Sequence, residues 1–371
     1  MLSSVFVTRD AETSSIRRSL VFVAVLILGL AAVDRAVRTW WIGRTLPTAD
    51  LYWIWDPEWP RDPVRPHAFQ AIRSFEIDEV PDSADLLVAT DEEYRLYLNG
   101  RWVGSGRLQP LGSWHAYPVA SLLRPGENLL TMELRSGRGV GGLLLCLEGP
   151  GGEGCVVSSD GRWTSFFEYQ EGLHQERANP DAGGPVRVWG RVGTGEWPLP
   201  EGRTRRPLAE ECVETARRVP ARRIQDLRPS GERARRMPVW RAWWPSYSRG
   251  IVGLRLLGGE REVGRLDFGP ERKASVEGGA FGVLVTQPGQ EVFVTTEGWG
   301  FRYLQAKGLR ALEGAWYWPI REREECRAYY APEERPDPRG ILGVTPPRSH
   351  PPVENELWRE FEGLSSLAGG E

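Results

Sequence analysis

Short apolar runs separated by glycine, proline, asparagine and aspartate recur from residue 68 to residue 320, and they restrict the fold more than any other feature of the chain. Asn99-Gly100 lies between two such runs and suits a two-residue type I′ hairpin, because both residues tolerate positive φ. The candidate strands around it are AIRSFEI, ADLLVAT, YRLYL, RWVG, NLLTMELR, GGLLLCLE, CVVSS and RWTSFFEY. Many short strands with turn signals are typical of an antiparallel sandwich, which we expect over residues 68–200.

A second series of candidate strands follows and predicts a second β-sandwich over residues 238–320. Its members are IVGLRLLGG, EVGRLDFG, ASVEGGAFGVLVT, GQEVFVTTE, FRYLQAKGL and AWYWPI. Residues 201–237 between the two sandwiches are rich in arginine and predict a linker. Four of these arginines could bind phosphate or lipid headgroups, although a solvated linker with arginine–glutamate pairs is the favoured interpretation. They are Arg217, Arg218, Arg222 and Arg223.

An apolar segment, residues 20–33, follows Arg17-Arg18 near the start of the chain. It is either a cleaved signal peptide or an uncleaved anchor. The run is shorter than the roughly 20 residues that a span needs, but the tryptophans after it suit a membrane interface. Because the sequence retains the segment, we interpret it as a transmembrane anchor over residues 19–42, preceded by a head, residues 1–18. The anchor and interface residues are Leu20, Val33, Trp40 and Trp41.

Basic residues flank the anchor almost equally, so charge hardly determines its orientation. The short head and large body favour a single-pass protein of a bacterial inner membrane, with its N-terminus in the cytoplasm and its body in the periplasm. Four cysteines suit an oxidising compartment. Cys146 and Cys155 flank a glycine- and proline-rich turn and could face each other, which leaves Cys212 and Cys326 as a second pair. Four unpaired buried thiols are the alternative.

Residues 43–67 include YWIWDPEWPRDPVRP, whose prolines predict an extended spacer. Residues 321–371 form a proline-rich tail with one amphipathic patch, VENELWREFEGL. Such tails are usually disordered unless a partner holds them. Tryptophans in the spacer and the tail are candidates for docking on that partner: Trp53, Trp55, Trp59 and Trp358.

No catalytic pattern emerges from the polar residues. The four histidines are scattered, there is no nucleophile elbow, and the cysteines lack the close paired spacing of zinc sites. GRGVGG, residues 137–142, precedes a strand rather than a helix and predicts a loop, not a phosphate cradle. The charge is nearly balanced, with 47 basic and 50 acidic residues, which argues against nucleic acid as a partner. We therefore predict no enzymatic activity, cofactor or metal.

Several motifs resemble the β-sandwiches that precede the catalytic domain of bacterial alpha-L-rhamnosidases. DEEYRLYLNGRWVG, LLRPGENLLTMEL and SDGRWTSF, from residue 91 to residue 166, are similar to the first sandwich. LDFGPERKASVEG and GFRYLQAKGL, from residue 266 to residue 309, are similar to a further one. The resemblance implies a mainly β chain with two jelly-roll, galactose-binding-like domains. The family's helical catalytic barrel has no counterpart, so none of its catalytic carboxylates is matched.

Two functions remain. The first is a non-catalytic scaffold subunit whose partners are the lipid bilayer and integral membrane proteins of a larger complex. A photosynthetic reaction centre with its light-harvesting antenna is one context, which no motif supports. The alternative is carbohydrate binding, in which exposed aromatic rings stack on a sugar. The candidates for that platform are Trp102, Trp114, Tyr117 and Trp163, although a core role is favoured for each.

Overall fold

The computed structural model describes residues 51–56, 67–90, 93–107, 113–136, 141–149, 154–175, 183–192, 200, 202–227, 238–270 and 280–331, together with residues 23, 26, 29, 30 and 33. The chain divides into two units, Met1–Ala49 and Asp50–Glu371. The five described residues of the first unit are helical. No helix among the described residues has the length and hydropathy to cross a bilayer. Leu20, Trp40, Trp41, Trp59 and Trp358 lie outside the described residues, as does most of the predicted anchor.

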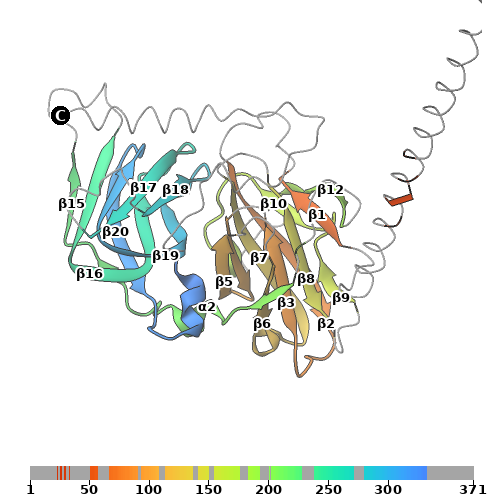
Figure 1. Cartoon of the computed structure of the whole chain (residues 1–371). Helices are drawn as coiled ribbons and strands as arrows, with labels where there is room; N and C mark the ends of the chain where they lie inside the picture. Colours follow the sequence, from red (N-terminus) through yellow and green to blue (C-terminus); the bar gives the residue numbers. More distant parts are fainter. Residues whose placement is uncertain are drawn as a thin grey trace, which may run out of the picture. The chain divides into compact units, whose positions relative to one another are not determined.

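The second unit begins with two sheets that are antiparallel except for one edge pair (Figure 1). Sheet I has the strand order β12 (Arg187–Arg191), β1 (Tyr52–Trp55), β8 (Leu143–Glu148), β3 (Asp85–Thr90), β6 (Trp114–Pro118) and β13 (Arg203–Arg205), with β9 (Cys155–Ser158) paired to β8. Sheet II has the order β11 (Gly184–Pro185), β10 (Thr164–Phe166), β2 (His67–Ile77), β7 (Gly126–Ser136), β4 (Glu93–Leu98) and β5 (Arg101–Arg107).

One apolar core joins sheets I and II. Alternation along each strand sends every second side chain inward, as with Leu86 and Val88 of β3 and Leu96 and Leu98 of β4, all of them fully buried. The predicted hairpin is confirmed, because β4 pairs with β5 across Asn99 and Gly100, whose φ angles are 51° and 78°. The described chain is mainly β with antiparallel sheets, as expected.

Sheet III follows the connector, residues 206–218, which leads from β13 of sheet I to the first strand of sheet III. Its strand order is β14 (Val219–Pro220), β20 (Leu312–Pro319), β16 (Val239–Leu256), β19 (Val292–Lys307), β17 (Val263–Gly269) and β18 (Ala280–Val285), with β15 (Arg223–Asp226) paired to β16. One face carries its own core, in which Phe268 stacks on Trp299 at 4.7 Å and Trp244 meets Phe301 edge-on at 4.8 Å.

Two intervals predicted as connections contribute strands. Residues 43–67 include β1, whose apolar run YWIW is buried, because the prolines that would oppose a strand begin only at Pro57. Residues 201–237 include β13, α2 (Ala209–Cys212), β14 and β15. In that interval the backbone of β13, β14 and β15 pairs with strands of sheets I and III rather than with solvent.

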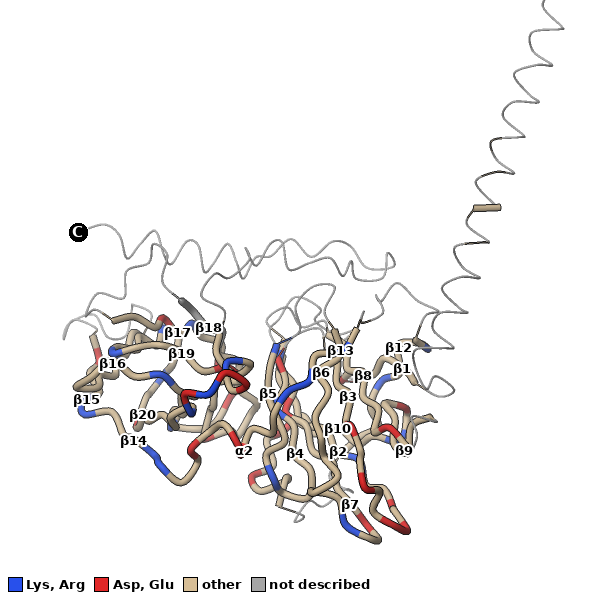
Figure 2. The backbone as a smooth tube through the Cα atoms, turned by 60° about the horizontal axis from the view of Figure 1, so that its bottom comes forward, with Lys and Arg blue, Asp and Glu red and all other residues tan. Residues whose placement is uncertain are grey.

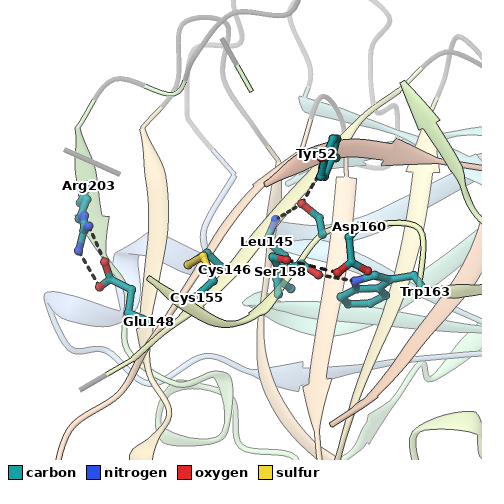
Figure 3. The surroundings of a disulfide bond; sticks show 10 residues. Tyr52, Leu145, Cys146, Glu148, Cys155, Ser158, Asp160, Trp163 and Arg203 are labelled. Atoms are coloured by element: carbon teal, nitrogen blue, oxygen red, sulfur yellow. Dashed lines mark hydrogen bonds and ion pairs between the residues drawn. A yellow bond between two sulfur atoms is a disulfide. The ribbon is translucent and has the colours of Figure 1, made fainter. Parts of the chain in front are cut away.

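Two disulfides are present, and they are the two pairs that the sequence analysis proposed ahead of unpaired thiols. Cys146–Cys155 joins β8 to β9 within sheet I (Figure 3). Cys212–Cys326 joins α2 to the 3-10 helix η5 (Glu325–Tyr329), with a sequence separation of 114 residues that includes all of sheet III. Closing a loop of that length restricts the unfolded chain, which in a chain-entropy model stabilises the fold by about 4–5 kcal/mol.

Charged side chains on sheet II lie buried against β19 of sheet III. Arg95 donates to the carbonyl oxygens of Val294 at 2.7 Å and Thr295 at 3.0 Å, and to Glu133 at 3.1 Å. Arg135 lies over the ring of Phe293, 4.3 Å from its centroid. The polar face of sheet II is therefore covered by β19 instead of facing water. The guanidinium of Arg95 hydrogen-bonds to backbone carbonyls of β19 where the two sheets meet.

We expect Arg95→Leu to lower the free energy of unfolding by about 3–5 kcal/mol, because it leaves the buried carboxylate of Glu133 without its closest cation. Arg101→Leu is the control, since its ion pair with Glu210 is half-exposed and should be worth less than about 1 kcal/mol. Urea unfolding of the full chain in a neutral detergent measures both. Similar losses for the two variants would contradict the assigned role of Arg95.

Candidate functional site

A surface pocket of about 570 Å³ lies where β3 begins and β6 ends. The loop before β3, the 3-10 helix η1 (Ala120–Leu122) and the connector from β13 to α2 form its walls. Backbone hydrogen bonds hold these segments together: Val119 N–H donates to Ala84 at 2.9 Å, and Arg206 N–H donates to Ala116 at 2.9 Å. The lining residues are Pro81, Asp82, Ser83, Ala84, Asp85, Pro118, Ala120, Ser121, Arg205, Leu208 and Glu211.

The pocket is polar and net negative. It has three carboxylates, from Asp82, Asp85 and Glu211, against one guanidinium, from Arg205. Two serine hydroxyls add groups that both donate and accept. None of these described lining residues is aromatic. Neither in this pocket nor in the rest of the described chain is a group of three or more histidine, cysteine or acidic side chains arranged to hold a metal ion. The pocket therefore suits a small hydroxyl-rich or cationic group better than an apolar one.

A buried cluster of polar rings lies between sheets I and II near the connector. Tyr94 of β4 is hydrogen-bonded through its hydroxyl to Tyr117 at 2.7 Å and to Nδ1 of His115 at 2.6 Å. The guanidinium of Arg206 lies over the ring of Tyr329 at 4.9 Å. The strand β5 leaves room for the cluster through two glycines, since a Cβ at Gly104 would lie 2.2 Å from Tyr117 and one at Gly106 would lie 2.9 Å from Arg206.

Burial determines the protonation state of this cluster. Burial, together with the positive charge of Arg206, lowers the pKa of His115 to about 3. Burial also raises the pKa of Tyr94 and that of Tyr117. The hydroxyl of Tyr94 lies between the other two polar groups and is hydrogen-bonded to both. His115 is therefore neutral over the physiological range, and its imidazole contacts Tyr94 inside the fold.

The predicted sugar platform is mostly inside the protein. Trp114 is 1% exposed and Tyr117 is fully buried, so neither offers a ring to a ligand. Trp163 is also 1% exposed, and its indole N–H donates to Ser158 at 2.9 Å beside the Cys146–Cys155 disulfide (Figure 3). Trp102 is partly buried and packs against the cluster around Cys212 and Cys326. These four rings therefore do not form a shared stacking surface.

The described tryptophans of the predicted spacer are core residues as well. Trp53 is 3% exposed and Trp55 is 1% exposed, with Trp55 in edge-on contact with Phe69 at 4.9 Å. Neither side chain is available to dock on a partner. The physical reason is that β1 pairs with β12 and β8, which places YWIW inside sheet I rather than on an open segment.

The pocket itself was not predicted. The run DEVPDSA before β3 is a loop signal, rich in turn-forming residues, and places Asp82 on a loop that leads to Asp85, the first residue of β3. Arg205 and Glu211 lie 120 or more residues further along the chain, and no local pattern connects them to that loop. Only the parallel pairing of β13 with β6, in which Arg205 lies opposite Ala116, brings the two segments together.

Comparison with known proteins finds similarity only among solved structures. No protein-family model and no curated protein matches the sequence. Among solved structures, an alpha-L-rhamnosidase from Dictyoglumus thermophilum matches with 14% identity and a TM-score of 0.43, over 73% of this chain and 35% of the enzyme. The rhamnosidase from Streptomyces avermitilis matches with 19% identity and a TM-score of 0.42, over 70% of this chain and 29% of the enzyme. The chain thus spans about a third of these enzymes.

A lectin from Pleurotus ostreatus is also similar, with 12% identity and a TM-score of 0.31, over 72% of this chain and 79% of the lectin. The resemblance to alpha-L-rhamnosidases stated from the sequence motifs is therefore found again when structures are compared, and it concerns a partial region of those enzymes.

We expect the free energy of unfolding to fall as the pH is lowered from about 6.5 towards about 3, because the unfolded chain then protonates His115 and the folded chain does not. His115→Gln removes this difference. Its stability should decline less steeply than that of the wild type, by up to about 1.4 kcal/mol per pH unit. Urea unfolding at several pH values measures both slopes, and parallel slopes would contradict the assignment.

Proposed function

We propose that the chain is a non-catalytic, membrane-anchored scaffold subunit that binds and stabilises a larger integral membrane complex from the extracytoplasmic side. The observation that carries the proposal is an exposed apolar helical face. Val23, Leu26, Leu30 and Val33 are spaced by three and four residues, which places them on one side of a helix, and they are 48–63% exposed. An apolar face of this kind is suited to lipid or to neighbouring transmembrane helices.

The two disulfides support an extracytoplasmic location for the body. Disulfides persist in oxidising compartments such as the bacterial periplasm and are rare in the cytosol. Both pairs join secondary-structure elements at separations of 9 and 114 residues, so they fix the body rather than a peripheral loop. The second unit is held together by two disulfides and by a buried network of ion pairs, as expected for a rigid scaffold.

The grouping of the three sheets into sandwich domains is part of the same proposal. We infer that sheets I and II form a jelly-roll, galactose-binding-like sandwich, supported by their shared core, and that sheet III belongs to a second sandwich domain. In this interpretation the sandwiches are sugar-enzyme modules used for their surfaces. The bilayer and integral membrane proteins are the proposed partners.

For the anchor, we expect the native chain to stay in the membrane pellet after alkaline carbonate and to be released by mild detergent with a stoichiometric set of integral membrane proteins. Leu26→Glu/Leu30→Glu should move most of the protein to the supernatant, because charged residues at the centre of a span cost about 2.5–3.5 kcal/mol each. Val156→Glu/Val188→Glu, at exposed apolar positions of the body, is the matched control and should stay in the pellet. A partner-free native chain in the carbonate supernatant would contradict the proposal.

Carbohydrate binding is the second candidate, and the polar pocket favours it. Residues with three carboxylates, one guanidinium and two hydroxyls line a space of about 570 Å³, which is within the usual range for a small-ligand site. Carboxylates are strong acceptors for sugar hydroxyls. The site would bind mainly through hydrogen bonds, because none of its described lining residues is aromatic.

If the pocket binds a sugar, Asp85→Asn and Glu211→Gln should each weaken binding about ten- to hundredfold, since a hydrogen bond to a charged group contributes about 1.5–3 kcal/mol. A glycan array probed with the full chain identifies the sugar, and calorimetry gives the affinities. Glu76→Gln, at an exposed carboxylate of β2 outside the pocket, should change nothing. An array without a bound sugar, or an affinity that neither Asp85→Asn nor Glu211→Gln changes, would exclude this pocket as the sugar site.

A further inference from the structure

Arg218 and Trp316 form a stacked pair on sheet III. The guanidinium carbon of Arg218 lies 3.5 Å from the centroid of the Trp316 ring, which is the separation of a parallel stack. Trp316 belongs to β20 and is only 3% exposed. Its position depends on Gly253 of β16, the residue opposite it, because a Cβ there would lie 2.3 Å from the indole. The ring is therefore seated on the strand and covered by the arginine.

Arg255 adds a second guanidinium beside this pair. It lies two residues after Gly253 on β16, so strand alternation places it on the same face of the sheet. It pairs with Gly314 of β20, and a Cβ at Gly314 would lie 3.3 Å from Arg255 and 3.9 Å from Trp316. Arg218 and Arg255 thus flank one indole, one from the connector before β14 and the other from β16. We call these three residues the arginine–tryptophan platform.

The two charges of the platform have no carboxylate counterpart in the part of the chain that the structure describes. Among the described residues, neither Arg218 nor Arg255 has an acidic oxygen within 4.0 Å. Burial and the positive charge of Arg255 lower the pKa of Arg218. The preceding residue differs, since Arg217 forms an ion pair with Glu214 at 3.6 Å. Figure 2 shows basic positions next to β14 and β15.

We propose that the arginine–tryptophan platform binds a phosphate group. A guanidinium presents parallel N–H donors that match the oxygens of phosphate, and stacking on an aromatic ring holds its plane while leaving those donors free. An oxyanion between Arg218 and Arg255 would neutralise two like charges that the fold holds close together. Leu257, two residues beyond Arg255, is 62% exposed, and a lone apolar side chain beside cationic groups suits a lipid headgroup region.

The phosphate can come from two sources, an anionic phospholipid headgroup or a soluble phosphate. The proposal goes beyond the scaffold function and does not depend on the anchor, because every group of the platform belongs to the second unit. The full chain in a neutral detergent is the material for the test. Native mass spectrometry counts retained phosphatidylglycerol against phosphatidylcholine, and calorimetry measures inorganic phosphate.

Three variants separate the platform from its surroundings. Arg218→Gln should weaken binding of the phosphate probe at least tenfold, and Arg255→Gln should do the same from the other side of the ring. Arg217→Gln removes the same charge one residue away and should change binding less than twofold. Lipid that is bound by the anchor segment would be retained to the same extent in all three variants. Lipid that is bound by the platform would be lost only in Arg218→Gln and Arg255→Gln.

Each outcome decides the proposal. Retention of phosphatidylglycerol that is lost in Arg218→Gln and kept in Arg217→Gln supports it with a membrane source. The same pattern for inorganic phosphate, without lipid retention, supports it with a soluble source. Absence of both ligands, or equal losses for Arg217→Gln and Arg218→Gln, overturns it. Carbonate extraction tests membrane anchoring separately from phosphate binding. A failure of the scaffold function would therefore not be mistaken for a failure of the platform.

Discussion

The contact between sheet II and β19 is the interaction on which the rest of the second unit depends. Arg95 neutralises Glu133 and at the same time donates to the carbonyls of Val294 and Thr295, so one guanidinium satisfies groups on both sheets. Ser105 donates to Thr296 at 2.7 Å in the same contact. Buried charges are tolerated only when each is paired, which makes this contact specific in orientation as well as stable. Cys212 and three lining residues of the pocket, Arg205, Leu208 and Glu211, lie in the segment of chain that leads from one side of this contact to the other.

The sequence was sufficient for the class of fold because its signals are local. Asn99-Gly100 requires a particular turn, and alternation in β3 and β4 assigns the inward face without knowledge of the partner strand. The same reasoning failed for Trp53 and Trp55, where the nearby prolines outweighed the apolar run in the prediction. Burial of both tryptophans depends on β12, more than 130 residues away, and no local pattern contains that pairing.

The candidate sites were harder to predict for the same reason. Aromatic residues suggested a sugar platform, but Trp114 and Tyr117 fill the space between two sheets, and sequence alone does not distinguish an exposed ring from a buried one. The polar pocket and the arginine–tryptophan platform each combine residues from distant strands. In the platform, Arg218 was noticed as part of a basic run, while its stacking partner became visible only through the pairing of β20 with β16.

The Cys212–Cys326 bond also determines how the molecule would carry mechanical load. A pull applied at Asp50 and at the tail after Ala331 would pass along the chain to Cys212, cross the sulfur bridge to Cys326 and leave through the tail. Residues 213–325, which contain all of sheet III, lie outside that covalent path. Sheet III would therefore carry no tension through its backbone and would keep its shape under a force that strained sheets I and II.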